Sequence, residues 1–108
     1  EICNYYTEQL SSIIKTPVTV EGNSHSWYVY VIQTAERDSL KQHLEDAGIG
    51  TNIHYMRAAH QQLAFAPWSR SLPVTERTVS EILSVPCWYS MTDSEVDYVV
   101  DSVKGWKS

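Results

Sequence analysis

Residues 27–32, Trp-Tyr-Val-Tyr-Val-Ile, form an unbroken run of aromatic and β-branched side chains. Such a run is typical of a strand in the interior of a sheet whose two faces are both covered. Tyr28 and Tyr30 should point to one face and their neighbours to the other, because side chains alternate along a strand. The run therefore predicts a sheet at the centre of the fold, either covered on both faces or with one face open to a partner.

Apolar residues that recur every three or four positions predict four helices. The first runs from Ile2 to Ile14 and ends before Pro17, because a residue that precedes proline avoids helical backbone angles. The second covers residues 37–47 and is closed by Gly48. The last follows Thr92 and Glu95, which have the spacing of a capping box. Its buried face would consist of Val96, Val99, Val100 and Val103, and a further short helix is predicted around Val79, Ile82 and Leu83.

Shorter stretches predict additional strands. Residues 18–20 and 51–55 are strand candidates, and residues 85–88 would form an edge strand, because Pro86 cannot donate a ladder hydrogen bond. Residues 63–73 predict a surface loop with a helical turn. The expected fold is α/β of the α+β type, a two-layer sandwich in which helices cover one face of a small, mostly antiparallel sheet. A chain of 108 residues has the length of a single domain, residues 1–108.

Charge and composition exclude some partners. The net charge is -5 and the eight Lys and Arg residues are scattered, whereas nucleic-acid binding requires a clustered basic face. We expect a cytoplasmic protein with no membrane partner, because no apolar run approaches the ~20 residues of a membrane span and no signal-peptide pattern opens the chain. Cys3 and Cys87 are expected to be reduced structural thiols rather than a disulfide. Glu1 already lies in a helical pattern without an initiator Met, which predicts a piece of a longer chain.

Polar groups that could bind a ligand are concentrated between Gly48 and Gln62, where His54 and His60 flank Arg57. Two imidazoles without nearby cysteines do not supply the three or four donors of a zinc site. Both histidines could be ordinary hydrogen-bonded residues, and Arg57 could be a solvated charge or bind a phosphate or carboxylate. The sequence contains neither a Gly-x-Ser-x-Gly elbow nor a glycine-rich phosphate loop.

The nine residues from Ala47 to Tyr55, Ala-Gly-Ile-Gly-Thr-Asn-Ile-His-Tyr, followed by His60 and Gln61, resemble the C-terminal domain of the DegT/StrS sugar aminotransferases. The resemblance covers nearly the whole chain in order. Residues 56–59, Met-Arg-Ala-Ala, replace the prolines that many members carry between the two histidines. This variant is similar to the branch that makes 4-amino-4-deoxy-arabinose for lipid A modification. The other matching segments are Trp27-Tyr28, Arg37-Asp38, residues 72–76, Val85-Pro86 and residues 91–95.

The resemblance implies an enzyme that uses pyridoxal phosphate on a fold type I scaffold. Such enzymes transfer an amino group, commonly from glutamate, to a keto group on a nucleotide-linked sugar. The lysine that binds the cofactor would lie in a large N-terminal domain, because no lysine of this chain matches it. The chain would then be the small C-terminal domain of a longer protein, without catalytic or cofactor-binding residues and inactive alone. The full-length enzyme is expected to be a homodimer.

The same resemblance implies that His60, His54 and Arg57 are substrate-binding residues that face the sugar-nucleotide pocket. His60 is expected to be exposed at the rim of this pocket. No residue is expected to bind a metal. The alternative is a free-standing ligand-binding or regulatory module without catalysis, because a two-layer fold does not define a function by itself.

Overall fold

Residues 1–107, which the computed structural model describes, are organised around two antiparallel strands, β1 (Tyr30–Gln33) and β2 (Ile82–Val85). Tyr30 lies opposite Val85 and Gln33 lies opposite Ile82. A single bridge extends the pair on each side: Lys15 pairs with Gln33, and Asn52 pairs with Ser84. The chain therefore forms a very small sheet whose strands are contributed by distant parts of the sequence.

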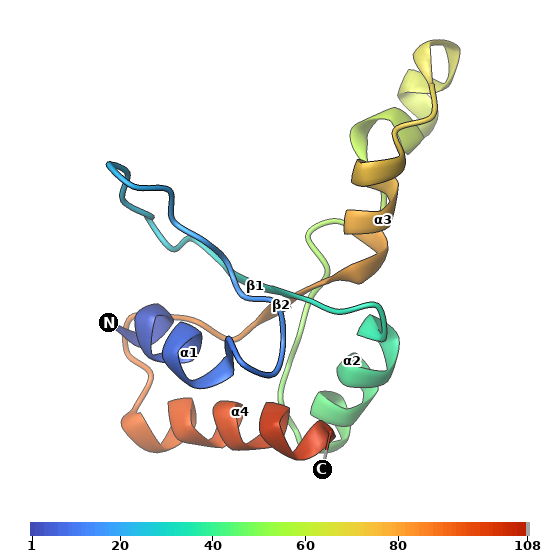
Figure 1. Ribbon diagram of the computed structural model, residues 1–108. Coiled ribbons are helices and arrows are strands. Elements are labelled where there is room, and N and C mark those ends of the chain that lie inside the picture. Colours follow the sequence, from blue (N-terminus) through green and yellow to red (C-terminus); the bar gives the residue numbers. More distant parts are fainter. Residues whose placement is uncertain (108) are drawn as a thin grey trace.

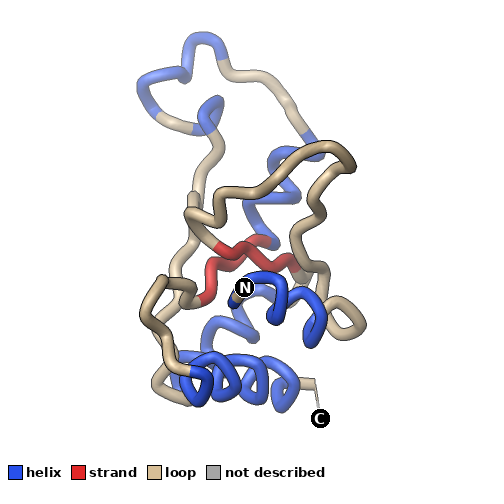
Figure 2. Tube along the Cα trace, turned by 90° about the vertical axis from the view of Figure 1, so that its left-hand side faces the viewer, coloured by secondary structure: helices blue, strands red, loops and turns tan. Residues whose placement is uncertain are grey.

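Three helices, α1 (Ile2–Leu10), α2 (Arg37–Asp46) and α4 (Asp93–Trp106), cover one side of this sheet (Figure 1). In the turned view of Figure 2 the strands lie between one group of helices and a second part of the chain, in which long loops alternate with further helical turns. Residues 55–81 project away from the helical side, and we call them the arm (Figure 1). The arm contains α3 (Pro73–Glu81) and two 3-10 helices, η1 (Ala59–Gln61) and η2 (Leu63–Trp68).

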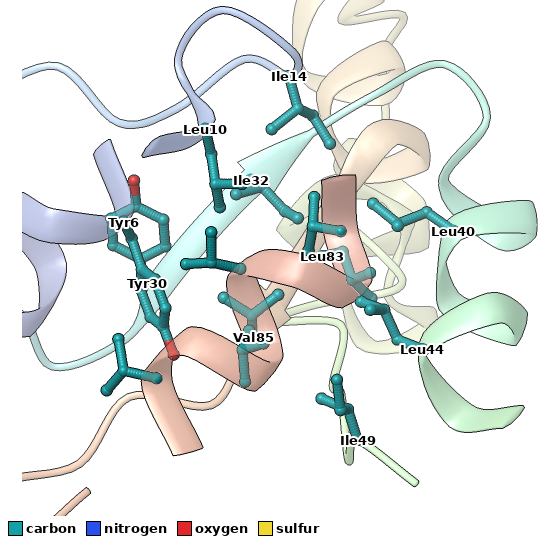
Figure 3. Close-up of a cluster of buried hydrophobic side chains, with 14 of the residues drawn as sticks. Tyr6, Leu10, Ile14, Tyr30, Ile32, Leu40, Leu44, Ile49, Leu83 and Val85 are labelled. Atoms are coloured by element: carbon teal, nitrogen blue, oxygen red, sulfur yellow. The ribbon is translucent and has the colours of Figure 1, made fainter. Parts of the chain in front are cut away.

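The hydrophobic core lies between the sheet and these three helices (Figure 3). In β1, the buried residues Tyr30 and Ile32 alternate with half-buried neighbours, as expected for a strand with one face on the core. Each fully buried side chain of Leu or Ile size contributes about 1.5–3 kcal/mol, so this face determines how the helices dock. The largest fully buried side chains are those of Tyr6, Tyr30, Leu10, Ile32, Leu40, Leu44, Leu83, Val100 and Val103.

The expected two-layer α+β fold is confirmed, and two helix boundaries agree with the sequence signals. The backbone N–H of Glu95 donates to Thr92 Oγ1 (3.2 Å), and the N–H of Thr92 donates to Glu95 Oε2 (2.8 Å), which completes the capping box of α4. Helix α2 ends before Gly48, whose φ of +79° lies in the left-handed region that favours glycine. All four valines predicted for the inner face of α4 are buried.

Several predicted strands are wrong in extent. The strand expected at residues 27–32 is shifted to Tyr30–Gln33, and Tyr28 is 87% exposed, so the run is not covered on both faces. Trp27, with a positive φ of 54°, turns the chain just before β1. The strands expected at residues 18–20 and 51–55 are absent and are replaced by the single bridges at Lys15 and Asn52.

Two helix predictions also need correction. Helix α1 ends at Leu10 rather than Ile14, although Ile14 remains buried in the core. The short helix expected around Val79, Ile82 and Leu83 is correct only at Val79, because α3 ends at Glu81 and the other two residues belong to β2. Leu83 gains a fully buried position by pairing with Ile32, and this long-range contact outweighs the local helical spacing.

Candidate functional site

His54 is attached to the sheet through two side chains. Its Nδ1 lies 2.8 Å from Ser84 Oγ, on β2, and its Nε2 lies 3.2 Å from Asn52 Nδ2. Asn52 and Ser84 also exchange two backbone hydrogen bonds, with N···O distances of 3.1 and 2.7 Å. The imidazole is therefore anchored directly to the bridge that extends the sheet. The peptide bond between His54 and Tyr55 is cis.

These contacts define the tautomer of His54. Asn52 Oδ1 accepts a hydrogen bond from the backbone N–H of Ile53 (2.8 Å), so the amide orientation is fixed and its Nδ2 faces the imidazole. An amide nitrogen can only donate, and His54 Nε2 must therefore be the acceptor. In the neutral ring the proton then resides on Nδ1 and is donated to Ser84 Oγ. The hydroxyl proton of Ser84 remains available for another acceptor.

A groove of about 230 Å³ opens beside this pair. Among the residues that line it are His54, Ser84 and Asn52, and none of the lining residues is Asp, Glu, Lys or Arg. Thr51 also lines the groove, and its Oγ1 is a buried polar atom without a hydrogen-bond partner among the described residues. The groove can therefore offer hydrogen bonds to a hydroxylated ligand, but it supplies no counter-ion for a charged one.

His60 lies in the arm, on η1, where its Nε2 is 3.0 Å from Glu76 Oε1 on α3. The same oxygen accepts a hydrogen bond from the backbone N–H of Leu72 (3.0 Å). These two hydrogen bonds hold the pKa of Glu76 below its usual range, and the bond from the Leu72 N–H has the larger effect. The His60 side chain is only 11% exposed, so the expectation that it is an exposed side chain is wrong. His60, on η1, is therefore hydrogen-bonded to a second element of the arm, α3.

Arg57 is exposed at the base of the arm, and its guanidinium has no ion-pair partner among the described residues. Its carbonyl oxygen accepts a hydrogen bond from Gln62 Nε2 (3.2 Å). His54 is hydrogen-bonded to β2 and His60 to α3, and no hydrogen bond or ion pair within residues 1–107 joins these histidines to each other or to Arg57. The three expected residues therefore lie in one continuous segment, but no hydrogen bond or ion pair among the described residues links them.

Ser84 and Glu76, the partners of the two histidines, were not identified as functional candidates from the sequence. Ser84 lies within the stretch predicted to end a helix and begin an edge strand, so its position opposite Asn52 had no local signal. Glu76 is separated from His60 by 16 residues and meets it because the arm folds back on itself. Sequence spacing alone reveals neither pairing.

The chain contains four lysines. Lys41 pairs with Glu45 and Lys107 with Glu36, while Lys104 donates to Gln9 Oε1 and Lys15 is exposed. None of the four lines the groove beside His54 or two larger grooves within residues 1–107. No group of three or more His, Cys, Asp or Glu residues within residues 1–107 could hold a metal ion. No helix in that range is long and apolar enough to cross a bilayer.

Residues 1–104 match the DegT/DnrJ/EryC1/StrS aminotransferase family. The chain belongs to this family. It is similar to a dTDP-3-amino-3,6-dideoxy-alpha-D-galactopyranose transaminase of Aneurinibacillus thermoaerophilus, with 33% identity over 105 residues, which are 95% of this chain and 29% of that protein. The chain thus spans less than a third of the length of the curated relatives it matches.

Two solved structures show the same fold. A DegT/DnrJ/EryC1/StrS aminotransferase from Brucella abortus superposes with a TM-score of 0.91 at 32% identity, over 97% of this chain and 29% of that chain. NtdA from Bacillus subtilis, solved with the cofactor PMP bound, superposes with a TM-score of 0.81 at 25% identity, over 97% of this chain and 26% of that chain. The α+β fold is therefore that of a segment of these two proteins.

Proposed function

We propose that this chain is the small, C-terminal domain of a pyridoxal-phosphate-dependent aminotransferase that acts on a nucleotide-linked keto sugar, with glutamate as the amino donor. The family match over residues 1–104 carries the proposal. The similarity to a transaminase of a dTDP-linked amino sugar supports the substrate class. The enzyme would work in the cytoplasm as a homodimer, and the small domain would dock on its own large N-terminal domain.

The cofactor, when bound, supplies the electron sink for amino transfer. We assign its covalent lysine to the large domain, as the family resemblance implies; none of the four lysines of this chain lines the grooves described above. The role left to residues 1–108 is to bind and orient the sugar nucleotide. The chain alone should accordingly give no stoichiometric adduct on one specific lysine after incubation with pyridoxal phosphate and reduction with borohydride.

Each of the three candidate residues suits a different part of a sugar nucleotide. Arg57 is exposed and lacks an ion-pair partner within residues 1–107, and its planar fork can bind phosphate oxygens through two hydrogen bonds. His54 and Ser84 border a groove without formal charges, which suits sugar hydroxyls. His60 would contact the sugar through the arm that it helps to hold together. The segment 56–59 leads us to propose a 4-amino-4-deoxy-arabinose precursor as the sugar.

The test is an amino-transfer assay on the complete protein with glutamate and a set of nucleotide-linked keto sugars. We expect formation of the amino sugar, and we expect Arg57→Gln to raise KM more than it lowers kcat, because phosphate binding is the same in the ground state and the transition state. Tight binding of nucleotide sugars with no transfer to any of them would instead support the binding or regulatory module.

A further inference from the structure

Two thiols from opposite ends of the chain face each other at the edge of the core. Cys3 Sγ, on α1, lies 2.8 Å from Cys87 Sγ, in the segment that follows β2, although 84 positions separate the two residues. Both cysteines are free. Because disulfide sulfurs are about 2.05 Å apart, the two atoms need to approach by only about 0.8 Å to bond. The proposed amino transfer uses neither thiol.

A second contact holds the same two segments together. Tyr6 Oη, one turn after Cys3 on α1, donates a hydrogen bond to the carbonyl oxygen of Pro86, which directly precedes Cys87 (2.7 Å). Tyr6 is fully buried, so this hydrogen bond is shielded from water. The position of Cys3 against Cys87 is therefore fixed by the packing of α1, independently of the thiols themselves.

We propose that Cys3 and Cys87 are a redox modification site, which forms an intramolecular disulfide by exchange with a low-molecular-weight disulfide. In the first step the Cys87 thiolate attacks the small disulfide, forms a mixed disulfide and releases one small thiolate. In the second step Cys3 loses its proton to that thiolate and attacks the Cys87 sulfur, which releases the second small thiolate. Two protein thiols are oxidised, one small disulfide is reduced to two thiols, and the two protons leave with them.

The two cysteines differ in access to solvent, and the pKa of Cys3 is raised; these two features order the steps. Cys3 is only 3% exposed, whereas Cys87 is half-buried and can be reached from solvent. Burial first, and then the hydrogen bond and the charge of Cys87, raise the pKa of Cys3 to about 12. Once Cys87 is a neutral mixed disulfide, its thiol and thiolate no longer raise the pKa of Cys3. Cys3 then becomes easier to deprotonate. Cys87 is thus the entry point and Cys3 the resolving thiol.

The proposal can be tested on the complete folded protein in a buffer of reduced and oxidised glutathione, followed by acid quenching and mass spectrometry of tryptic peptides. We expect the peptide that ends at Lys15 to be joined to the peptide Thr78–Lys104, with the loss of two hydrogen atoms. The equilibrium between the reduced and the cross-linked protein gives the effective concentration of one protein thiol at the other. It should exceed the value for the guanidinium-unfolded protein by at least about tenfold, because chain flexibility dilutes thiols that are 84 positions apart.

Two variants separate the roles of the thiols. Cys87→Ser should remove the cross-link and leave Cys3 unmodified, while Cys3→Ala should accumulate glutathione on Cys87. Glutathione bound to Cys87 in the unaltered protein without a cross-link would overturn the proposal, and so would an effective concentration no higher than that of the unfolded protein. Glutathione on Cys3 in Cys87→Ser would overturn the order of the steps. Cross-linking in the unaltered protein tests whether Cys3 and Cys87 form the disulfide, even where a variant folds poorly.

Discussion

Glu76 Oε1 receives a hydrogen bond from His60 Nε2 at 3.0 Å and another from the backbone N–H of Leu72, also at 3.0 Å. One carboxylate oxygen thereby joins η1 to the N-terminus of α3, where an acidic side chain is also favoured by the helix dipole. His60 is consequently part of the arm's internal structure. A role in sugar binding must therefore be distinguished from a role in positioning the arm.

A pair of variants makes this distinction in the complete enzyme. His60→Ala and Glu76→Ala both remove the contact between the two side chains, but only the first removes the imidazole. If His60 hydrogen-bonds the sugar, its loss should lower kcat/KM for the sugar nucleotide by about tenfold more than the loss of Glu76, as expected for one hydrogen bond. Steady-state kinetics of the two variants provides the measurement. Equal kinetic losses would show that His60 acts only through the arm.

The lowered pKa of Glu76 predicts how the stability of the arm depends on pH. A carboxyl group whose pKa is lower in the folded state than in the unfolded state stabilises the fold above its ordinary value of about 4.3. The stabilisation is lost as the pH falls through the lowered folded pKa. Protection of the Leu72 amide against hydrogen exchange should therefore decrease in that acidic range.

Glu76→Gln is the matched control for this pH dependence, because it keeps the size of the side chain and an acceptor oxygen but cannot ionise. We expect the Leu72 amide to be less protected in this variant at neutral pH, and the difference from the unaltered protein to disappear in acid. A difference that stays constant across the titration of Glu76 would contradict the linkage.

The hydrogen bonds of His54 predict that the neutral ring carries its proton on Nδ1 and that Nε2 is unprotonated. Nitrogen-15 NMR of the side chain distinguishes the two tautomers of the neutral ring directly. Ser84→Ala removes the acceptor for Nδ1–H and should return the ring to a mixture of tautomers, whereas Ser80→Ala, an exposed serine on α3, should leave it unchanged. A proton on Nε2 in the unaltered protein would show that the contact with Asn52 does not persist in solution.

Local signals in the sequence were sufficient for parts of the fold that depend on neighbouring residues. The capping box of α4 and the end of α2 at Gly48 follow from side-chain and backbone preferences within one turn of helix. The four valines of α4 likewise report the buried side of the helix by their spacing alone.

The features that local sequence signals missed depend on pairing between residues that are far apart in the sequence. Only the pairing of β1 with β2 reveals that Leu83 belongs to a strand, because its spacing from Val79 is equally compatible with a helix. The same holds for the candidate site. His54 and His60 were identified from their sequence context, but their partners Ser84 and Glu76 lie 30 and 16 positions away and are brought near them by the folded chain.

The capping box of α4 offers a test of how strongly this helix supports the whole fold. Thr92 Oγ1 satisfies the N–H of Glu95, and α4 buries its valines against the other core helices, so fraying at its start should weaken the core. Thr92→Ala should lower the free energy of unfolding of the 108-residue chain by about 1 kcal/mol, within the range of 0.5–2 for the loss of such a cap. Urea unfolding followed by tryptophan fluorescence provides the measurement.

Thr75→Ala, in the exposed first turn of α3, is the matched control and should change the free energy of unfolding by less than about 0.5 kcal/mol. Equal effects of the two substitutions would mean that the first turn of α4 contributes no more to stability than an ordinary surface position.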